Sequence, residues 1–380
     1  MALVDRYLLR QFWQVFIICF CSLTGLYIVI DGFGNLEEFI TYSQKQGNLL
    51  SVMGEFYAYQ SLSFFDRTSG ILTLISAMFT VAWIQRHNEL TALQAAGISK
   101  SRVVMPIIVA VIGVSIVSAA NREVVIPIPS VRQALSRKPQ DLGGTTARPL
   151  HPRYDYETSI LFRGKGTFAD KQRIHKPNFS FPAALERYGK QLTAEDAFYY
   201  PPQAPRPGGY LLEKVDPSAG LDQEPSLMLR GKPVIITPPD APDWLKPGQC
   251  FLVSDVSFEQ LDGGATWQQY SSTSELIRGL RNRSLDFGAD VRVAIHSRIV
   301  QPLLDVTLLF LGLPLVLARD SRNVFMAIGL CVGLVVLFML VVLACQFLGS
   351  SYWLNPALAA WLPLMIFVPC AVGLSEPLRE

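Results

Sequence analysis

Long apolar runs alternate with polar stretches along the chain. Six runs contain almost no ionisable side chains, namely residues 11–30, 70–84, 103–120, 299–318, 324–348 and 356–374. A bilayer core of ~30 Å needs about 20 apolar residues in helical conformation. The run at 70–84 reaches that length when it is extended back to Leu62, which brings Asp66 and Arg67 to the membrane edge. The pattern predicts six transmembrane helices, three on either side of residues 121–298.

The region between the third and fourth runs has the pattern of a water-soluble domain built from short strands. The expected strands are Ser159–Arg163, Tyr210–Val215, Leu227–Leu229, Val234–Thr237 and Phe251–Leu261, and a short helix is expected at Ser274–Arg283. Proline and glycine separate these segments. Short strands punctuated by turn residues are typical of an all-β sandwich, roll or barrel.

Charge then fixes the expected orientation. Charged residues make up 17% of the chain and the net charge is +2, whereas a soluble domain carries about 25% charged residues. With six spans, the side that holds both termini carries Arg6, Arg10, Arg86, Lys100, Arg102, Arg319, Arg322 and Arg379, and the short connections opposite offer only Lys45 and Arg67. The positive-inside rule therefore places both termini in the cytoplasm and the large domain outside it.

The sequence lacks the common signatures of an enzyme or a metal site. It has no Walker A, HExxH, CxxC or GxSxG pattern, and its four histidines are scattered. We therefore expect no catalytic residue, no metal and no cofactor. Among the carboxylates, Asp305 lies deepest in a span, where a proton-coupled carrier would place more such groups. A position near the interface, or a pair with Arg298, is the simpler expectation for it.

The segment RHNELTALQAAGIS, residues 86–99, stands between the second and third runs. Asn88 is placed to cap a helix, Glu89 suits its first turn, and Gly97 suits its end. The expected helix has about two to three turns and carries small residues along its sides. Two interpretations are open: a docking surface on which Glu89 meets a basic residue of a soluble partner, or an interfacial connector whose charges stay solvated.

Four stretches in the same order resemble one family. NELTALQAAGIS resembles the cytoplasmic coupling helix of the LptF/LptG lipopolysaccharide export permeases. Asn121-Arg122-Glu123 with Pro127 is similar to that family's exit from the third span. The stretch 296–323 is similar to its fourth span and the following loop, and the stretch 354–367 to its last span. The resemblance covers the membrane part, roughly half of the chain.

This resemblance, with the hydrophobic pattern, predicts an α-helical membrane protein with six transmembrane helices (3+3) and an inserted periplasmic all-β, β-jellyroll-like domain. The expected limits are residues 1–121 for helices 1–3 with the coupling helix 86–99, residues 122–290 for the periplasmic domain, and residues 291–380 for helices 4–6. The expected location is a bacterial inner membrane.

The resemblance implies a permease subunit of an ABC transporter that extracts lipopolysaccharide from the inner membrane. The implied partners are an LptB-like ATPase dimer that hydrolyses the ATP, a second LptF-like permease subunit or a second copy of this chain, and LptC-like and LptA-like periplasmic proteins. No nucleic acid is expected. The stretch Val4–Phe12 and the position of Asp31 look more like LptG than LptF.

Site residues carried over from the resemblance fall into two groups. Glu89 is the expected ATPase contact, with Leu90, Leu93 and Gly97 shaping the coupling helix. The lipid-binding candidates are Asp31, Arg67, Arg298, Phe16, Phe20, Val335 and Phe338. LptG-like proteins often have a lysine shortly before that aspartate, whereas this chain has Ile28-Val29-Ile30. Another cation therefore takes that role, with Lys45 a further choice, or the bound lipid differs.

Three other functions compete. A permease of the lipoprotein-release type usually has four spans and a long domain after the first, unlike this layout. A non-transporting inner-membrane scaffold would use its β domain to bind an envelope partner and would need no coupling helix. A secondary carrier is disfavoured by the scarcity of charge within the spans.

Overall fold

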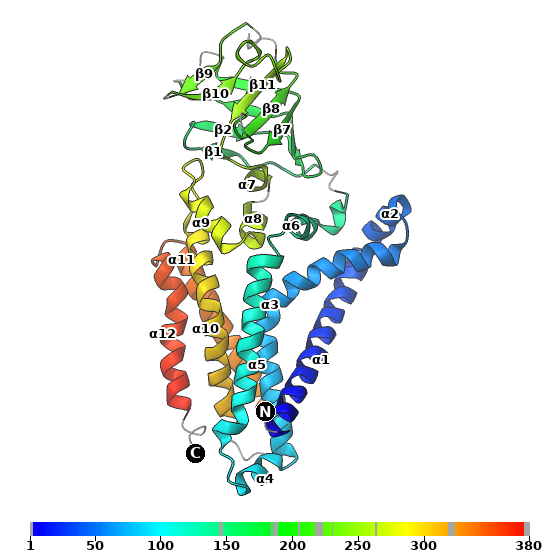
Figure 1. The fold of residues 1–380 in the computed structure, drawn as a ribbon, viewed down its shortest axis with the longest axis vertical. Coiled ribbons are helices and arrows are strands. Elements are labelled where there is room, and N and C mark those ends of the chain that lie inside the picture. The colour runs from blue at the N-terminus through cyan, green and yellow to red at the C-terminus, as the bar shows by residue number, and fades with distance from the viewer. Residues whose placement is uncertain are drawn as a thin grey trace. The chain divides into compact units, whose positions relative to one another are not determined.

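The computed structural model describes residues 3–143, 147–183, 185, 189–203, 206–216, 223–229, 231–262, 264–317 and 324–375. Two compact units make up the chain: a helical unit of residues 1–135 and 288–380, and a β unit of residues 136–287 (Figure 1). Among the basic residues behind the predicted orientation, Arg319, Arg322 and Arg379 lie outside the described residues, as does the side chain of Lys45.

In the part of the chain that the structure describes, six helices are long and apolar enough to cross a membrane. They are α1 (Leu3–Gly34), α3 (Leu49–Arg86), α5 (Lys100–Ala120), α10 (Ala289–Leu317), α11 (Val324–Ser350) and α12 (Pro356–Leu374). The prediction of six spans is confirmed. The helices extend past the apolar runs because backbone hydrogen bonding continues where side chains become polar, whereas hydropathy marks only the stretch suited to lipid.

Shorter helices connect the spans. Helix α2 (Leu36–Gln46) links α1 to α3, α4 (Glu89–Ala95) links α3 to α5, and α6 (Pro129–Ser136) follows a π-helical turn at Asn121–Val125. Helix α3 begins where the Asn48 side chain accepts a hydrogen bond from the Leu50 amide at 3.3 Å. This N-cap satisfies one of the amides left unpaired at a helix start.

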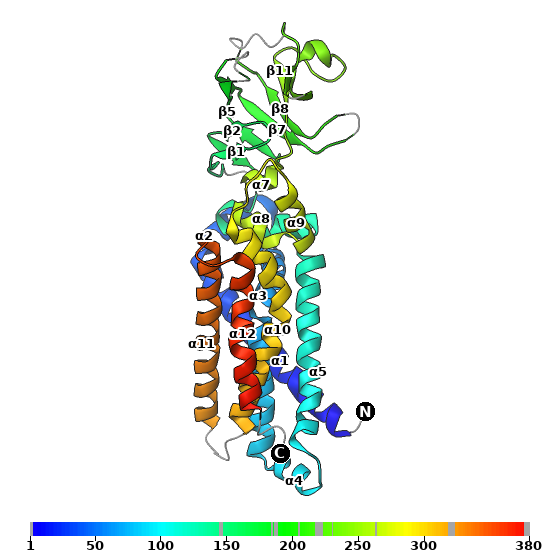
Figure 2. The same cartoon turned by 90° about the vertical axis from the view of Figure 1, so that its left-hand side faces the viewer.

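Helices α3, α5 and α10 lie side by side in both views (Figures 1 and 2). Ser76 and Thr80 of α3 are fully buried, and their hydroxyls donate to carbonyls of their own helix at 2.6 and 2.7 Å. Small side chains with satisfied polar groups let helix backbones approach closely in a membrane. Gly312 of α10 contributes to the same packing, facing Leu74 and Met78 of α3.

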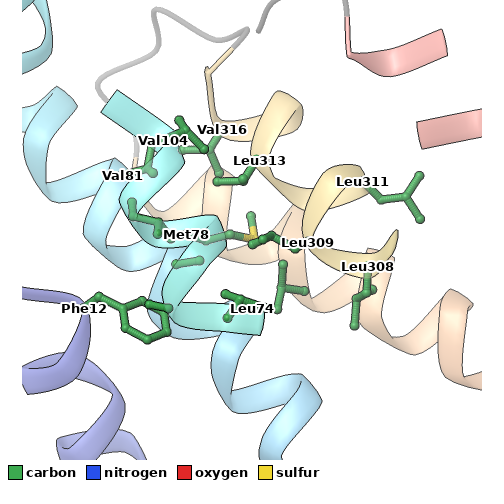
Figure 3. Close-up of a cluster of buried hydrophobic side chains, with 14 of the residues drawn as sticks. Phe12, Leu74, Met78, Val81, Val104, Leu308, Leu309, Leu311, Leu313 and Val316 are labelled. Atoms are coloured by element: carbon green, nitrogen blue, oxygen red, sulfur yellow. The ribbon is translucent and has the colours of Figure 1, made fainter. Parts of the chain in front are cut away.

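The core of the helical unit draws on all six long helices and on α4. Figure 3 shows part of it, with Phe12 from α1, Val104 from α5 and Leu309 from α10 converging on side chains of α3. Leu90 of α4 belongs to the same cluster and is 8% exposed. Helix α4 is therefore packed against the core of the helical unit through Leu90.

The β unit contains two antiparallel sheets. A seven-stranded sheet has the order β3-β4-β7-β8-β11-β10-β9, and a four-stranded sheet has the order β1-β2-β5-β6. The strands are β1 (Arg153–Asp155), β2 (Ile160–Arg163), β3 (Gly166–Phe168), β4 (Arg173–His175), β5 (Asn178–Ser180), β6 (Gln191–Thr193), β7 (Asp196–Tyr200), β8 (Gly209–Glu213), β9 (Leu227–Leu229), β10 (Lys232–Ile236) and β11 (Gln249–Val253). An inserted all-β region is thus confirmed.

One expected strand is wrong in its second half. Of Phe251–Leu261, only the residues to Val253 are in β11, and helix α7 (Phe258–Asp262) follows. The Ser257 hydroxyl accepts from the Gln260 amide at 3.3 Å, and the Gln260 side chain accepts from the Ser257 amide at 3.0 Å. This reciprocal pair is a capping box, a local helix-start signal that outweighs the short alternation before it.

Two further helices complete the β unit, α8 (Gly264–Tyr270) and α9 (Thr273–Arg281). A capping box between Ser272 and Glu275 starts α9, so the expected helix at Ser274–Arg283 is confirmed within two residues at each end. Aromatic side chains fill the space between the sheets, and Phe162, Phe179 and Tyr210 are fully buried. Burial raises the pKa of Tyr210 well above its usual value, so its hydroxyl stays neutral and donates to a backbone carbonyl.

Candidate functional site

Helix α4 begins after a two-residue turn at His87 and Asn88. Asn88 has a φ of 57°, in the left-handed region, and its side chain makes no capping hydrogen bond. The expectation that Asn88 caps the helix through its side chain is therefore wrong. Asparagine still suits the position, because it adopts left-handed backbone more readily than most residues.

The end of α4 matches the sequence prediction. Gly97 has a φ of 80°, its amide donates to the Gln94 carbonyl at 2.9 Å, and the Ile98 amide donates to the Leu93 carbonyl at 3.0 Å. These two bonds form a Schellman motif, in which a left-handed glycine follows the last helical residues. Glycine suits this helix end because it adopts the left-handed backbone without the strain that a side chain would bring.

The two faces of α4 differ in what they contact. Leu90, Leu93 and Ile98 lie against the core of the helical unit. The opposite face is exposed and consists of small or short polar residues, namely Thr91, Ala92, Gln94, Ala95 and Ala96. The leucines thus anchor α4, and the outward face is free of bulky side chains.

Glu89 contacts the first turns of α1. The Tyr7 hydroxyl donates to Glu89 Oε1 at 3.3 Å across 82 residues of sequence. Close by, an Arg102 guanidinium nitrogen lies 2.9 Å from Asp5 Oδ2, again joining α1 to the region around α4. Sequence reasoning did not single out Tyr7 or Asp5, because no local pattern signals contacts between segments so far apart.

At the other end of α1, Asp31 joins α1 to α3. Its Oδ2 accepts a hydrogen bond from the Tyr57 hydroxyl at 2.8 Å, and its Oδ1 accepts from the Asn35 side chain at 3.2 Å. Aromatic rings surround the contact: Tyr27 of α1 stacks on Phe64 of α3 with centroids 5.4 Å apart. Asp31 is therefore bound within the chain on both of its oxygens.

The two arginine candidates have different environments. Arg67 is exposed, whereas Arg298 is partly buried and its backbone carbonyl accepts from Arg122 at 3.3 Å. Arg122 also lies 3.9 Å from Asp66, with side-chain exposures of 13% and 19%. Arg122 lies in the π-helical turn after α5, and Arg67, Arg122 and Arg298 all interact electrostatically with Asp66 of α3. The two arginine candidates therefore share one acidic neighbour, whereas Asp31 accepts its hydrogen bonds from Asn35 and Tyr57. Arg122 was not among the sequence candidates.

Asp305 lies in a buried polar cluster. It is 7% exposed and accepts from Gln301 of its own helix at 3.0 Å and from Ser115 of α5 at 3.5 Å. Gly70 of α3 places its backbone directly against the Asp305 carboxyl group. Three helices therefore meet at this side chain.

The four apolar candidates pack within the bundle. Phe16 is 6% exposed and stacks on Phe12, and Phe20 meets Phe65 of α3 edge-on at 5.8 Å. Phe338 of α11 lies 4.6 Å from the ring of Phe367 on α12, and the neighbouring Val335 packs on the same core.

Comparison with known proteins decides the family. The sequence model of the lipopolysaccharide export system permease LptF/LptG matches residues 6–138 and 188–376. The chain belongs to the LptF/LptG family. The matched segments hold the long helices, α4 and strands β6–β11, and the unmatched residues between them hold β1–β5. A search of curated proteins gave no match. Family membership and the six apolar helices make this LptF/LptG protein a multi-pass inner-membrane permease component of the lipopolysaccharide export system.

Proposed function

We propose that this protein is the permease subunit of an ABC exporter, and that a separate LptB-like ATPase dimer drives it by docking on α4. The observation that carries the proposal is the two-sided character of α4. Leu90 and Leu93 fix the helix to the core, and the opposite face presents small side chains to a partner. Because interface packing needs close approach, this face suits insertion into a groove.

Glu89 supplies the charge for this docking. It lies in the first turn of α4, is half-buried, and uses one oxygen for Tyr7. A carboxylate has capacity for further donors, so its second oxygen is available to an arginine or lysine of the ATPase. Truncating one partner of a desolvated charge pair costs about 2–5 kcal/mol, so loss of Glu89 should weaken docking strongly.

The proposed orientation follows the basic residues around α4. Basic residues lie in the first turns of α1, at the end of α3 and in the first turn of α5, namely Arg6, Arg10, Arg86, Lys100 and Arg102. The positive-inside rule supports a cytoplasmic position for it and hence a periplasmic position for the β unit. The ATPase would then meet α4 on the side where ATP is available.

On the lipid side, the exporter has to keep acyl chains out of water, since each exposed methylene costs about 0.8 kcal/mol. Apolar side chains are exposed along α1 and α11, among them Ile17, Ile18, Leu26, Ile30, Leu337, Leu340 and Phe347. We infer that these faces meet lipid or a second permease subunit, either LptF-like or another copy of this chain. Arg67 and Arg298 are the proposed contacts for lipid phosphates, in an LptG-like role.

Beyond the membrane, the proposal extends to the route of the lipid. The β unit would hand lipopolysaccharide to LptC-like and LptA-like proteins that bridge toward the outer membrane. A cluster of fully buried aromatic side chains occupies the space between its sheets, so passage of acyl chains through the unit would require its sheets to separate.

Co-purification with the LptB-like ATPase tests the docking. We compare the parent with Glu89→Ala and Glu89→Arg, and use Glu37→Arg as control because Glu37, like Glu89, is a first-turn carboxylate of a short connecting helix, here α2. Charge removal should weaken association, charge reversal should nearly abolish it, and the control should bind like the parent. Equal association of all four proteins would refute docking through Glu89, and absence of the ATPase from the parent would favour the scaffold hypothesis.

A further inference from the structure

The first turns of α1 contact both flanks of α4. Tyr7 reaches Glu89, the residue that begins α4, and Asp5 reaches Arg102, in the first turn of α5 just after α4. These four residues, Asp5, Tyr7, Glu89 and Arg102, form what we call the α1 clasp. Asp5 and Tyr7 lie within one turn of α1, and together they contact the residue that begins α4 and a residue shortly after its end.

Apolar packing lies behind the clasp. Leu8 and Phe12 follow it on α1 and are 1% and 0% exposed. They belong to the same buried cluster as Leu90 of α4 and Val103 of α5. The base of α1, α4 and the base of α5 are thus packed as one body, and the clasp adds directional polar contacts at its rim.

Beyond Phe16, α1 is much less enclosed. Only Thr24 and Gly32 are buried in its remaining length, and Ile18, Leu26 and Ile30 are exposed. Figure 1 shows α1 running at an angle away from α5 as it rises from the α4 end. At its far end α1 is tied to α3 again through Asp31 and Tyr57. Helix α1 is therefore held at both ends, and between them one side packs on α3 through Phe20 and Tyr27 while the other side is exposed.

We infer that the α1 clasp transmits displacement of α4 directly to α1, with Tyr7 and Asp5 as positioning residues of the transport cycle. The inference rests on the proposed docking of the ATPase on α4. Tyr7 holds one oxygen of Glu89, so a force applied to Glu89 by a docked cation is applied to α1 as well. The pair of Asp5 and Arg102 keeps the base of α1 in register with α5 during that movement.

The energetic scale of the clasp makes it testable. Tyr7 is 44% exposed and Arg102 57% exposed, and exposed ion pairs contribute little to stability. Removing these polar contacts should leave the fold intact, because the apolar packing of Leu8 and Phe12 remains. The effect should then appear in coupling rather than in folding.

The experiment uses the permease with its second subunit and the LptB-like ATPase, reconstituted in bilayers that contain lipopolysaccharide. The variants are Tyr7→Phe, which removes only the hydroxyl, Asp5→Asn, and the charge-swapped Asp5→Arg with Arg102→Asp. Tyr42→Phe on α2 is the matched control. Measured for each are the affinity for the ATPase, the thermal unfolding midpoint, and the lipid released per ATP hydrolysed.

If the α1 clasp transmits the movement, Tyr7→Phe and Asp5→Asn should each lower lipid release per ATP about three- to tenfold. Their ATPase affinity should stay within about twofold of the parent, and their thermal unfolding midpoint should be unchanged. The swapped pair should recover most of the loss left by Asp5→Asn. Unchanged coupling in Tyr7→Phe and Asp5→Asn would overturn the inference while the docking proposal stands. Loss of ATPase binding in these variants would also overturn it, since the clasp would then shape α4 rather than transmit its movement. Failure of the parent to bind the ATPase would refute the docking proposal itself.

Discussion

Gly70 on α3 is the position where a single methyl group tests the packing of the helical unit most sharply. A Cβ built at Gly70 would overlap Oδ1 of Asp305 and would lie 3.0 Å from Asp305 Cγ. The Asp305 carboxyl group would have to move, and its hydrogen bonds from Gln301 and Ser115 would be lost. Because the side chain is 7% exposed, water is a poor substitute for those donors.

The magnitude follows from three contributions. Overpacking a tight core costs about 1–3 kcal/mol, and leaving a buried polar group unsatisfied costs about 1–3 kcal/mol. Replacing glycine by alanine in a helix returns about 1 kcal/mol. Gly70→Ala should therefore destabilise the protein by about 1–5 kcal/mol, with about 3 kcal/mol as the middle of that range.

A double-mutant cycle isolates the contact. On an Asp305→Ala background the new methyl enters vacated space, so Gly70→Ala should be neutral there or stabilising by about 1 kcal/mol. The coupling energy between the two positions should then be about 3 kcal/mol. Gly113→Ala on α5 is the matched control, because nothing lies within 4 Å of a Cβ at that position.

The assay is unfolding of these variants and the parent in one detergent, followed by circular dichroism. Gly113→Ala should match or slightly exceed the parent in stability. If Gly70→Ala costs the same on both backgrounds to within about 0.5 kcal/mol, then Asp305 does not lie against Gly70 and the arrangement of α3 and α10 described above is wrong.

Three further predictions concern single side chains. Arg148→Gln leaves the buried carboxyl groups of Asp141 and Asp262 without their ion pairs to Arg148. It should destabilise the β unit by about 2–3 kcal/mol, which is less than the loss of a fully buried pair costs, because Arg148 is partly exposed. An unchanged unfolding midpoint would contradict this. Tyr57→Phe removes the hydroxyl that donates to the Asp31 carboxylate on α1 and should lower the free energy of unfolding by about 1 kcal/mol. An unchanged free energy in chemical denaturation would mean that this hydrogen bond does not stabilise the contact between α1 and α3. Partial desolvation of the carboxyl group, and after it the neighbouring carboxylates of Glu157 and Asp155, raise the pKa of Asp255. Its contribution to stability is therefore full below the unfolded pKa and is lost as pH rises through the folded pKa. Asp255→Asn should therefore stabilise the protein at neutral pH by about 0.5 kcal/mol or less, since the residue is exposed, and the gain should vanish below about pH 4; a gain that persists in acid would refute the electrostatic cause.

The helical unit was predictable from sequence because lipid imposes a long apolar run on every span. Helix α2 was missed since its eleven residues include charged and polar side chains, and its packing through Phe39 onto Phe56 depends on tertiary contact. In the β unit, three-residue strands such as β3 and β6 are too short to show alternation. The capping box at Ser257 and Gln260 is a signal that the sequence does carry, and it marks the start of α7 within the expected strand.

The candidate site was only partly visible in the same way. Gly97 predicts the end of α4 from sequence, because a helix often ends at a residue with left-handed backbone and glycine favours that conformation. The division of α4 into an anchored face with Leu90 and an exposed alanine face required the structure, since both faces carry apolar residues. The contacts of Tyr7 and Arg122 join separate helices, so a single sequence gives no signal for them.

ATP-dependent release of lipopolysaccharide tests the central claim most directly. The parent, Glu89→Arg and Glu37→Arg are each reconstituted with the second permease subunit and the LptB-like ATPase, and lipid transfer to a soluble LptA-like acceptor is followed. The account predicts transfer that requires ATP in the parent and in Glu37→Arg, and transfer near background in Glu89→Arg. Equal transfer by all three proteins, or transfer that proceeds without ATP, would contradict an exporter driven through α4.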